Sequence, residues 1–364
     1  MHIEQIRLLN FRNFATVDMQ PHPHLNIIFG ENGAGKSSLL EVIHVLGFGR
    51  SFRTSKSDTF ISHSEKSASG FCKYTLNNDV SSLGFTRLKG NGFEFSVNGE
   101  RTKRIIDIVR LLPVQIFTPQ SSDLLLGAPV GRRRYIDWLV FHVEHNFHKQ
   151  NSRYQSCLNQ RNALLKKFDF KQSSEFLQQD VWLEQLADIG ESISELRESY
   201  VKRLNDEISA LYAQFYPELN VVLRYNTGWE KNISLKDSIQ NKVERDLFRG
   251  STSSGPHKAD LQFLVDGRNA AEYLSRGQLR LLVSLLLLAE VRLLKKLTDK
   301  PSVFLIDDIS AELDESTRDK FISTLLEQDT QVFVTGIEKQ QMSFMQNYNN
   351  KKVFHVKQNH VFEE

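Results

Sequence analysis

The hydrophobic positions of this chain predict an α/β protein whose strands lie mainly toward its two ends. Mostly apolar runs at residues 25–29, 112–117, 303–306 and 331–335 have the length of buried strands. Residues 2–9 and 261–265 predict further strands, and short alternating segments across residues 71–95 predict a β-meander with turns at Asn77-Asn78 and at residues 90–92. Apolar residues recur at helical spacing in residues 38–46 and 279–294.

The middle of the chain has a different pattern. Between residues 181 and 215 the apolar positions recur every three or four residues, which predicts one long amphipathic helix that ends before Pro217. Such a helix would be roughly 50 Å long. Two interpretations remain open: a helix packed inside a compact lobe, or a protruding coiled-coil stub. The apolar positions are Trp182, Leu186, Ile189, Ile193, Leu196, Tyr200, Leu204, Ile208, Leu211 and Phe215.

These patterns predict a discontinuous α/β domain interrupted by a mostly helical insertion. We expect residues 1–118 to form its first part, residues 119–249 to form the inserted lobe, and residues 250–364 to complete the domain. No repeats or low-complexity tracts are visible. A chain of 364 residues is long enough for two lobes with sizeable cores.

Composition and charge add little evidence for a nucleic-acid partner. The chain has 40% hydrophobic and 25% charged residues and a net charge of +2, whereas dedicated nucleic-acid binders are usually much more basic. Any DNA contact must therefore come from local patches, although each patch could equally be a solvated surface run. The candidate patches are Arg50, Arg53 and Lys56; Arg101, Lys103 and Arg104; and Arg132, Arg133 and Arg134.

Other features predict a cytoplasmic protein without a membrane contact. The two cysteines, Cys72 and Cys157, form no C-x-x-C pair, so a disulfide framework or a zinc site is not expected. The first ten residues contain Glu4 and Arg7 and lack the apolar core of a signal peptide. The longest apolar run, at residues 281–289, is too short to cross a bilayer.

The most informative motif lies between the strand at residues 25–29 and the helix at residues 38–46. Residues 30–37 read GENGAGKS and match the phosphate-loop pattern G-x-x-x-x-G-K-[ST] in its required strand–loop–helix context. The glycines let backbone N–H groups surround phosphate oxygens, and the following helix adds its positive dipole end. Lys36 would reach the β- and γ-phosphates, and Ser37 would ligate Mg²⁺. A merely flexible glycine-rich turn is the alternative. The predicted nucleotide-binding residues here are Gly30, Glu31, Asn32, Gly33, Ala34, Gly35, Lys36 and Ser37.

A second acidic element follows the strand at residues 303–306. Asp307 and Asp308 come directly after four apolar residues, as in a Walker B element. Asp307 would hold Mg²⁺, and Asp308 would orient or deprotonate the attacking water. Many strands end in aspartate, so this pattern gains its meaning from the phosphate loop upstream. Lys36 and Asp308 are accordingly the predicted catalytic residues.

The order of GENGAGKS, LSRGQ at residues 274–278, FLIDD and SAELD resembles the ATP-binding-cassette ATPases. Together with FRNF at residues 11–14, GPHKAD at residues 255–260 and the segment at residues 117–137, it resembles the RecF family over nearly the whole chain. The resemblance implies a P-loop ATPase head. Arg276, Lys258, Ala259 and Thr335 depart from the patterns usual in these proteins, so Lys258 and Ala259 are given no role.

Ser275 precedes a helical pattern, so its hydroxyl and the following N–H groups predict a second anion site, and Gly277 permits close backbone approach. Taken alone, LSRGQ could also be an ordinary N-capped helix. The resemblance implies that Ser275, Gly277 and Gln278 of one copy face the ATP held by Lys36 of another. ATP would then bridge a homodimer, and hydrolysis would remove the bridge. Whether Gln120, Arg12 and Thr335 contact nucleotide stays open.

The resemblance further implies an ATP-gated protein of recombinational repair and replication restart, linked to the SOS response to DNA damage. It would clamp double-stranded and gapped DNA and cooperate with RecO and RecR mediators. Because Asp308 is shorter than the glutamate common in fast cassettes, we expect a slow, DNA-stimulated ATPase. The alternatives are the head of a chromosome-organising complex, or a transporter subunit, although transporter cassettes keep the equivalents of Lys36 and Ser275 much closer in sequence.

Overall fold

The structure is a computed structural model that describes residues 1–76, 79–169, 171–337 and 346–364. It contains two compact units, one formed by Met1–Ser121 with Arg276–Glu364 and the other by Ser122–Ser275. We expected the second boundary at residue 250, but residues 250–275 belong to the second unit. The reason is that β10 (Asp260–Val265) pairs antiparallel with β9 (Val221–Asn226). The expected turn at Asn77-Asn78 lies outside the described residues.

The first unit is built around a predominantly parallel sheet with the strand order β15-β14-β3-β13-β12-β8. Its five strands from β14 to β8 are parallel, and β15 adds an antiparallel edge. All residues of β3, β12 and β13 are buried, as their mostly apolar runs predicted. The strands are β3 (Leu25–Phe29), β8 (Val114–Phe117), β12 (Val303–Ile306), β13 (Gln331–Gly336), β14 (Lys351–Lys357) and β15 (His360–Glu363).

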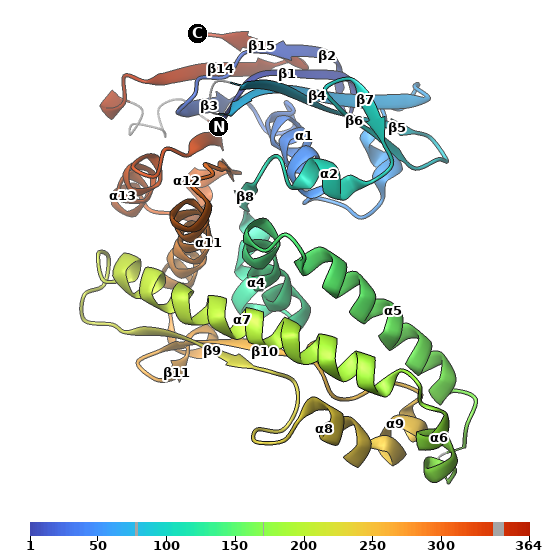
Figure 1. The fold of residues 1–364 in the computed structure, drawn as a ribbon. Coiled ribbons are helices and arrows are strands. Elements are labelled where there is room, and N and C mark those ends of the chain that lie inside the picture. The colour runs from blue at the N-terminus through green and yellow to red at the C-terminus, as the bar shows by residue number, and fades with distance from the viewer. Residues whose placement is uncertain (77–78, 170, 338–345) are drawn as a thin grey trace. The chain divides into compact units, whose positions relative to one another are not determined.

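A second, antiparallel sheet in the same unit has the order β2-β1-β4-β5-β6-β7. Its long central strands, β4 and β5, confirm the predicted meander. Helix α1 (Lys36–Phe48) lies between this sheet and the parallel one, and apolar residues of all three form one hydrophobic core (Figure 1). The strands are β1 (His2–Phe11), β2 (Phe14–Met19), β4 (Ser67–Leu76), β5 (Asp79–Leu88), β6 (Phe93–Val97) and β7 (Glu100–Thr102).

The remaining helices of the first unit follow strands of the parallel sheet or connect the two sheets, except α11, which leads from the second unit into β12. The predicted helix at residues 279–294 is the central part of α11, which is buried along most of its length. These elements are η1 (Ser57–Phe60), α2 (Ile105–Val109), η2 (Pro119–Ser122, which ends at the unit boundary), α11 (Arg276–Thr298), α12 (Ile309–Glu312) and α13 (Glu315–Leu326).

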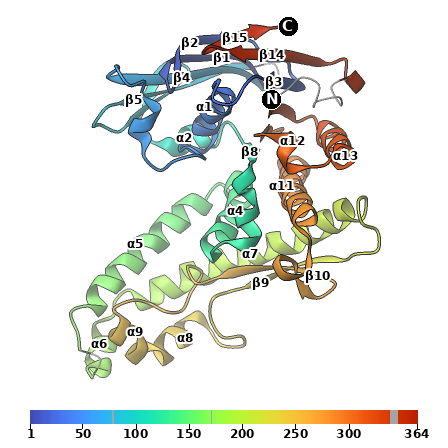
Figure 2. The same ribbon diagram turned by 180° about the vertical axis from the view of Figure 1, so that it is seen from behind.

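The second unit is mostly helical, as expected. Its longest helix, α7 (Leu183–Tyr212), ends ahead of Pro217 and packs against α4, α5, α8 and β9. In both views α5 runs alongside α7 (Figures 1 and 2). These contacts favour the compact lobe over the coiled-coil stub. The other elements are α3 (Asp123–Leu126), α4 (Pro129–Val143), α5 (Phe147–Leu165), α6 (Ser173–Gln179), α8 (Leu235–Asn241), α9 (Val243–Arg249), α10 (Ala270–Tyr273) and β11 (Arg268–Asn269), which pairs with β10.

Candidate nucleotide-binding site

The phosphate-loop motif lies between the end of β3 and the start of α1, in the predicted context. Gly30 and Gly35 have φ angles of 153° and 114°. A Cβ atom on Gly30 would lie 2.2 Å from the Val356 carbonyl oxygen, and one on Gly35 would lie 2.6 Å from the Phe14 ring. Only glycine satisfies both the backbone conformation and the space at these two positions.

Lys36 is the first residue of α1, and its side chain turns back over the loop. Its Nζ donates hydrogen bonds to the carbonyl oxygens of Gly30 (2.6 Å) and Glu31 (2.9 Å). Burial lowers the pKa of Lys36 from its ordinary value, and the nearby carboxylates of Asp308 and Asp307 oppose that shift. The ammonium group is therefore held at the loop, where an incoming phosphate could replace the two carbonyl oxygens.

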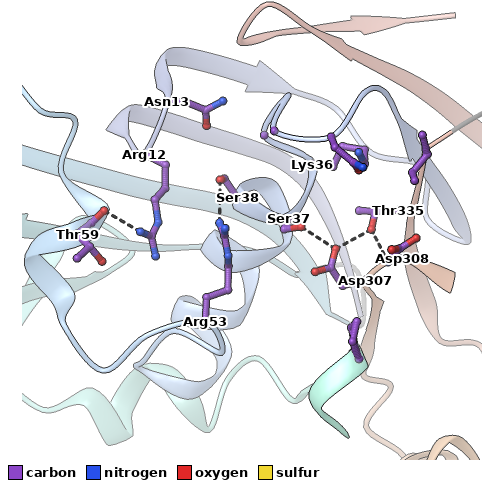
Figure 3. A pocket seen from close by; sticks show the side chains of 15 residues that line it. Arg12, Asn13, Lys36, Ser37, Ser38, Arg53, Thr59, Asp307, Asp308 and Thr335 are labelled. Carbon is purple, nitrogen blue, oxygen red and sulfur yellow. Dashed lines mark hydrogen bonds between the residues drawn. The ribbon is translucent and has the colours of Figure 1, made fainter. Parts of the chain in front are cut away.

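Two side chains from separate elements meet at Asp307, which follows β12 directly. Its Oδ1 accepts hydrogen bonds from Ser37 Oγ (2.9 Å) and Thr335 Oγ1 (2.7 Å), as Figure 3 shows. Thr335 Oγ1 in turn accepts a hydrogen bond from the backbone N–H of Asp308 at 2.9 Å. The sequence left the role of Thr335 open. Its proximity follows from the parallel pairing of β12 with β13, which sets Thr335 beside the end of β12.

The oxygen donors of Ser37 and Asp307 fit a hard cation such as Mg²⁺. Among the described residues no group of three or more histidine, cysteine, aspartate or glutamate side chains could hold a metal. A cation beside Ser37 and Asp307 would therefore take its other ligands from phosphate groups and water, as Mg²⁺ commonly does.

Asp308 occupies a strained and partly desolvated position. Its φ angle is 56°, in the left-handed region, and its Oδ1 is buried without a hydrogen-bond partner among the described residues. Burial and the neighbouring Asp307 carboxylate raise the pKa of Asp308, while Lys36 opposes the shift. An unpaired carboxylate with a raised pKa is suited to accepting a proton.

The phosphate loop, Asp307 and Asp308 line one pocket of about 540 Å³ (Figure 3). Asn13 and Thr59, which the sequence did not assign to a site, also line the pocket. So do Arg12, whose contact with nucleotide the sequence left open, and Arg53, which the sequence placed in a candidate DNA-contact patch. Its full lining is Arg12, Asn13, Asn32, Gly33, Gly35, Lys36, Ser37, Ser38, Arg53, Thr59, Pro119, Asp307, Asp308, Thr335 and Ile337.

A buried glutamate fixes the two arginines of this pocket. Glu41 accepts hydrogen bonds from Arg12 Nε (2.9 Å) and Nη2 (2.6 Å) and forms an ion pair with Arg53 at 3.7 Å. Arg12 Nη1 also donates to the Thr59 carbonyl oxygen at 2.9 Å. A signal in the sequence was Glu41 itself, a carboxylate on a helix whose other inner positions are mostly apolar.

The predicted signature residues do not line this pocket. Ser275 and Gly277 are exposed and Gln278 is half-buried, around the start of α11 at Arg276. That these three residues complete the pocket of a second copy stays a prediction. Gln120 is exposed in η2, where its neighbour Pro119 lines the pocket and Gln120 itself does not.

Two arginines of the predicted basic patches are held by close contacts inside the second unit, and the other seven basic residues of the patches are exposed. Arg132 makes a bidentate ion pair with Asp260 (2.7 and 3.0 Å), and Arg133 donates a hydrogen bond to the Ala259 carbonyl oxygen at 2.8 Å. The GPHKAD segment is thus bound to α4 inside the second unit. Arg134 remains exposed. In the first unit Arg53 belongs to the nucleotide pocket, while Arg101 and Arg104 pair loosely with Glu94 (3.8 Å) and Asp107 (3.8 Å).

Within the described ranges, no helix combines the length and apolar character needed to cross a membrane. The parallel sheet, the phosphate loop and the acidic pair after β12 define a class: the first unit is a P-loop ATPase head of the ATP-binding-cassette type, discontinuous in sequence, with a mostly helical inserted lobe.

Comparison with known proteins identifies the family. Residues 2–361 match the family model described as "RecF/RecN/SMC N terminal domain". The chain is 44% identical to the "DNA replication and repair protein RecF" of Pseudoalteromonas atlantica over 100% of both chains, and 36% identical to that of Shewanella denitrificans over 99% of both. The chain belongs to the RecF family.

Solved structures agree with this assignment. A structure described as the "recombination mediator protein RecF-ATPrS in RecFOR pathway" has a TM-score of 0.87 and 26% identity, and the match covers 100% of this chain and 98% of that one. An Smc head bound to the C-terminal winged-helix domain of ScpA has a TM-score of 0.59 at 16% identity, covering 100% of this chain and 97% of that one. The second likeness concerns the fold alone.

Proposed function

We propose that this chain is an ATP-dependent DNA-binding protein of recombinational DNA repair and replication restart. The observation that carries the proposal is the convergence of Lys36, Ser37, Asp307 and Asp308 on one pocket. Curated relatives over the full chain are called DNA replication and repair proteins, and a solved relative with a TM-score of 0.85 is described as RecF-ATP.

The pocket would hold ATP through its loop and its lysine. Residues 30–37 would surround the phosphates with backbone N–H groups, and Lys36 Nζ would exchange the Gly30 and Glu31 carbonyl oxygens for phosphate oxygens. Ser37 and Asp307 would hold Mg²⁺, which neutralises phosphate charge when bound. Asp308 would accept the proton of the attacking water. A weak, DNA-stimulated ATPase is the activity that we expect.

ATP would also join two copies of the chain. Ser275, Gly277 and Gln278 of one copy would contact the triphosphate in the pocket of the other. The exposure of Ser275 and Gly277 is compatible with that role. The ATP-bound homodimer would clamp double-stranded DNA near single-strand gaps and help RecO and RecR load the recombinase, as part of the SOS-linked damage response. Slow hydrolysis would then release the complex.

The head of a chromosome-organising complex is less well supported. The likeness to Smc heads concerns the fold. The longest helix among the described residues is α7, with 30 residues, and it packs within its own unit instead of extending as an arm.

The decisive experiment measures binding of a gapped duplex with and without ATP, while dimerisation is followed by sedimentation in the same samples. We expect the native chain to dimerise and bind gapped DNA only with ATP. Lys36→Ala should lose ATP binding, because the variant lacks the phosphate-contacting ammonium group, and with it both responses. Lys89→Ala, which changes an exposed turn lysine, is the matched control. ATP affinity unchanged in Lys36→Ala, or a native chain that remains monomeric at saturating ATP, would contradict the proposal.

A further inference from the structure

Helix α9 (Val243–Arg249), in the second unit, presents an aromatic side chain to solvent. Its inner face consists of Val243, Asp246 and Leu247, which are buried. On the outer face lie Arg245, Phe248 and Arg249, at the i, i+3 and i+4 spacing that places side chains together. Phe248 is 78% exposed, more than any other large hydrophobic side chain in the part of the chain that the structure describes. Single exposed apolar side chains are common on protein surfaces, and what distinguishes Phe248 is its place between two exposed arginines.

Further positive charges come from the end of α5. Lys166 packs against Gly250, directly after α9: the glycine's ideal Cβ position is 3.2 Å from the lysine Cγ. Lys167 follows it and is also exposed. We call Lys166, Lys167, Arg245, Phe248 and Arg249 the tip cluster.

The four cations of the tip cluster are available to a ligand. Across residues 1–76, 79–169, 171–337 and 346–364, none of them has a side-chain hydrogen bond, an ion pair or a ring contact. Two exposed acids, Asp169 and Glu244, lie in the same segments, so the surface remains net positive.

Buried hydrogen bonds and a small apolar core hold the tip cluster in place. The guanidinium of Arg161, on α5, is fully buried and donates to Asp180 (2.8 Å), Asp246 (3.0 Å) and Thr252 (2.7 Å). These bonds join α5 to the chain on both sides of α7 and to α9. A small apolar core lies next to them, made of Leu165, Phe176, Val243 and Leu247. The orientation of α9 is therefore fixed by buried contacts, and its outer face is presented without a flexible linker.

We propose that the tip cluster binds single-stranded DNA, with Phe248 stacking on an unpaired base and the four cations contacting neighbouring phosphates. The inference deepens the proposed function and rests on it, because it assigns one part of a gapped substrate to one surface. A single strand fits better than a duplex because a flat aromatic ring can stack only on a base whose face is open. The surrounding lysines and arginines supply the backbone contacts that such sites require.

The test uses the full-length chain with saturating ATP and three fluorescent DNA probes: an oligothymidylate, a blunt duplex and a gapped duplex. We expect Phe248→Ala to weaken binding to the oligothymidylate and the gapped duplex roughly tenfold, within the range measured for loss of one base-stacking contact. Blunt-duplex affinity should be unchanged, and Phe248→Trp should bind the single strand at least as well as the native chain. Phe362→Ala, which removes a phenylalanine 53% exposed in the first unit, is the matched control.

A second arm tests the charges and the location. Log affinity for the oligothymidylate should fall with log salt, and each phosphate contact on a single strand contributes about 0.7 to the size of that slope. The double variant Arg245→Ala with Arg249→Ala should therefore reduce the size of the slope by about 1.4. A strand containing 5-iodo-deoxyuridine should crosslink, under light, to the peptide that carries Phe248.

Each other outcome has a defined meaning. If the native chain binds none of the probes, the proposed function fails and the tip assignment fails with it. If the native chain binds gapped DNA and Phe248→Ala binds it equally well, only the tip assignment is overturned. If Phe248→Ala weakens binding to the blunt duplex as much as binding to the single strand, the tip cluster is a duplex contact. If Phe248→Ala binds all three DNA probes normally but binds a partner protein less well, the tip cluster is a protein-docking surface. Either result overturns the single-strand proposal.

Discussion

Asp308 combines three properties at one carboxyl group: a left-handed backbone, an unpaired buried oxygen and a raised pKa. Backbone strain of this kind persists only where the surrounding structure enforces it, and it is frequent at functional sites. Here the enforcing contact is the bond from the Asp308 N–H to Thr335, which itself contacts Asp307. We infer that this arrangement keeps the Asp308 carboxyl free for a water molecule.

Asp308→Asn should therefore separate binding from hydrolysis. The amide keeps the size of the side chain but cannot accept the proton, so we expect ATP turnover to fall about 100-fold or more. ATP affinity should change little, and sedimentation should show ATP-dependent dimers that persist. Asp307→Asn is the contrasting variant, in which Mg²⁺-dependent ATP binding itself should weaken. Unchanged turnover in Asp308→Asn would remove this residue from the catalytic role.

A second unusual carboxyl lies away from the pocket. Glu290, on α11, is fully buried, and its Oε2 accepts a hydrogen bond from Gln115 Nε2 at 2.6 Å. Its Oε1 has no partner in the part of the chain that the structure describes. Burial raises the pKa of Glu290 well above its ordinary value of 4.5, so the folded chain retains this proton at a pH where the unfolded chain has lost it.

This shift predicts how stability depends on pH. The contribution of Glu290 is fully present below about pH 4.5 and is lost as the pH rises toward the raised pKa of the folded state. Glutamine has no proton to lose, so Glu290→Gln should raise the melting temperature at pH 8 by about 2–4 °C, the effect of 1 kcal/mol in a large domain. The gain should shrink toward pH 4.5, and the exposed control Glu218→Gln should show none. A lower melting temperature for Glu290→Gln at pH 8 would contradict the assignment.

At the scale of elements, the short buried strands were the easiest to predict. The apolar runs at residues 25–29 and 303–306 coincide with β3 and β12, because a strand buried on both faces is mostly apolar along its whole length. The one polar residue of β3 is the buried Asn26. Strands β14 and β15 gave no comparable signal: β15 is largely exposed, and the apolar residues of β14 are interrupted by lysine and histidine. Their place in the sheet depends on pairing with β3 and with each other.

The start of helix α11 leads to a test of whether ATP joins two copies of the chain. The helix begins at Arg276, directly after Ser275, and its body is buried, so its start is held in a fixed position within the first unit. Ser275→Arg should leave ATP binding intact, because Ser275 does not line the pocket of its own chain. The bulky cation should nevertheless block a second copy, and sedimentation should show monomers at ATP concentrations that dimerise the native chain. Ser64→Arg, at another exposed serine, should dimerise normally; dimers of Ser275→Arg would exclude the role in a second copy's pocket.

At the scale of the whole molecule, a modest net charge must be reconciled with DNA binding. Arg132 and Arg133 stabilise the second unit from within, and Arg12 and Arg53 belong to the nucleotide pocket. A net charge of +2 therefore does not describe the surface offered to DNA. Contacts to phosphates would come from dispersed cations, and dimerisation would double their number.

The salt dependence of binding to duplex DNA measures those contacts. With ATP we expect log affinity to fall against log salt with a slope steeper than about −3, equivalent to at least three or four phosphate contacts. Lys36→Ala, which should remain monomeric, should give a shallower slope. A flat slope for the native chain with ATP would argue against a clamp on the DNA backbone.

The sequence alone determined the parts of the site that are continuous in the chain. Residues 30–37 and the acids after β12 were visible because a phosphate loop and a strand end are each specified by neighbouring residues. The contacts of Ser37 and Thr335 with Asp307, the fixing of Arg12 by Glu41, and the exposure of Phe248 were decided by the tertiary structure. Strand order and helix packing bring together residues that are far apart in sequence, and no local pattern specifies those distances.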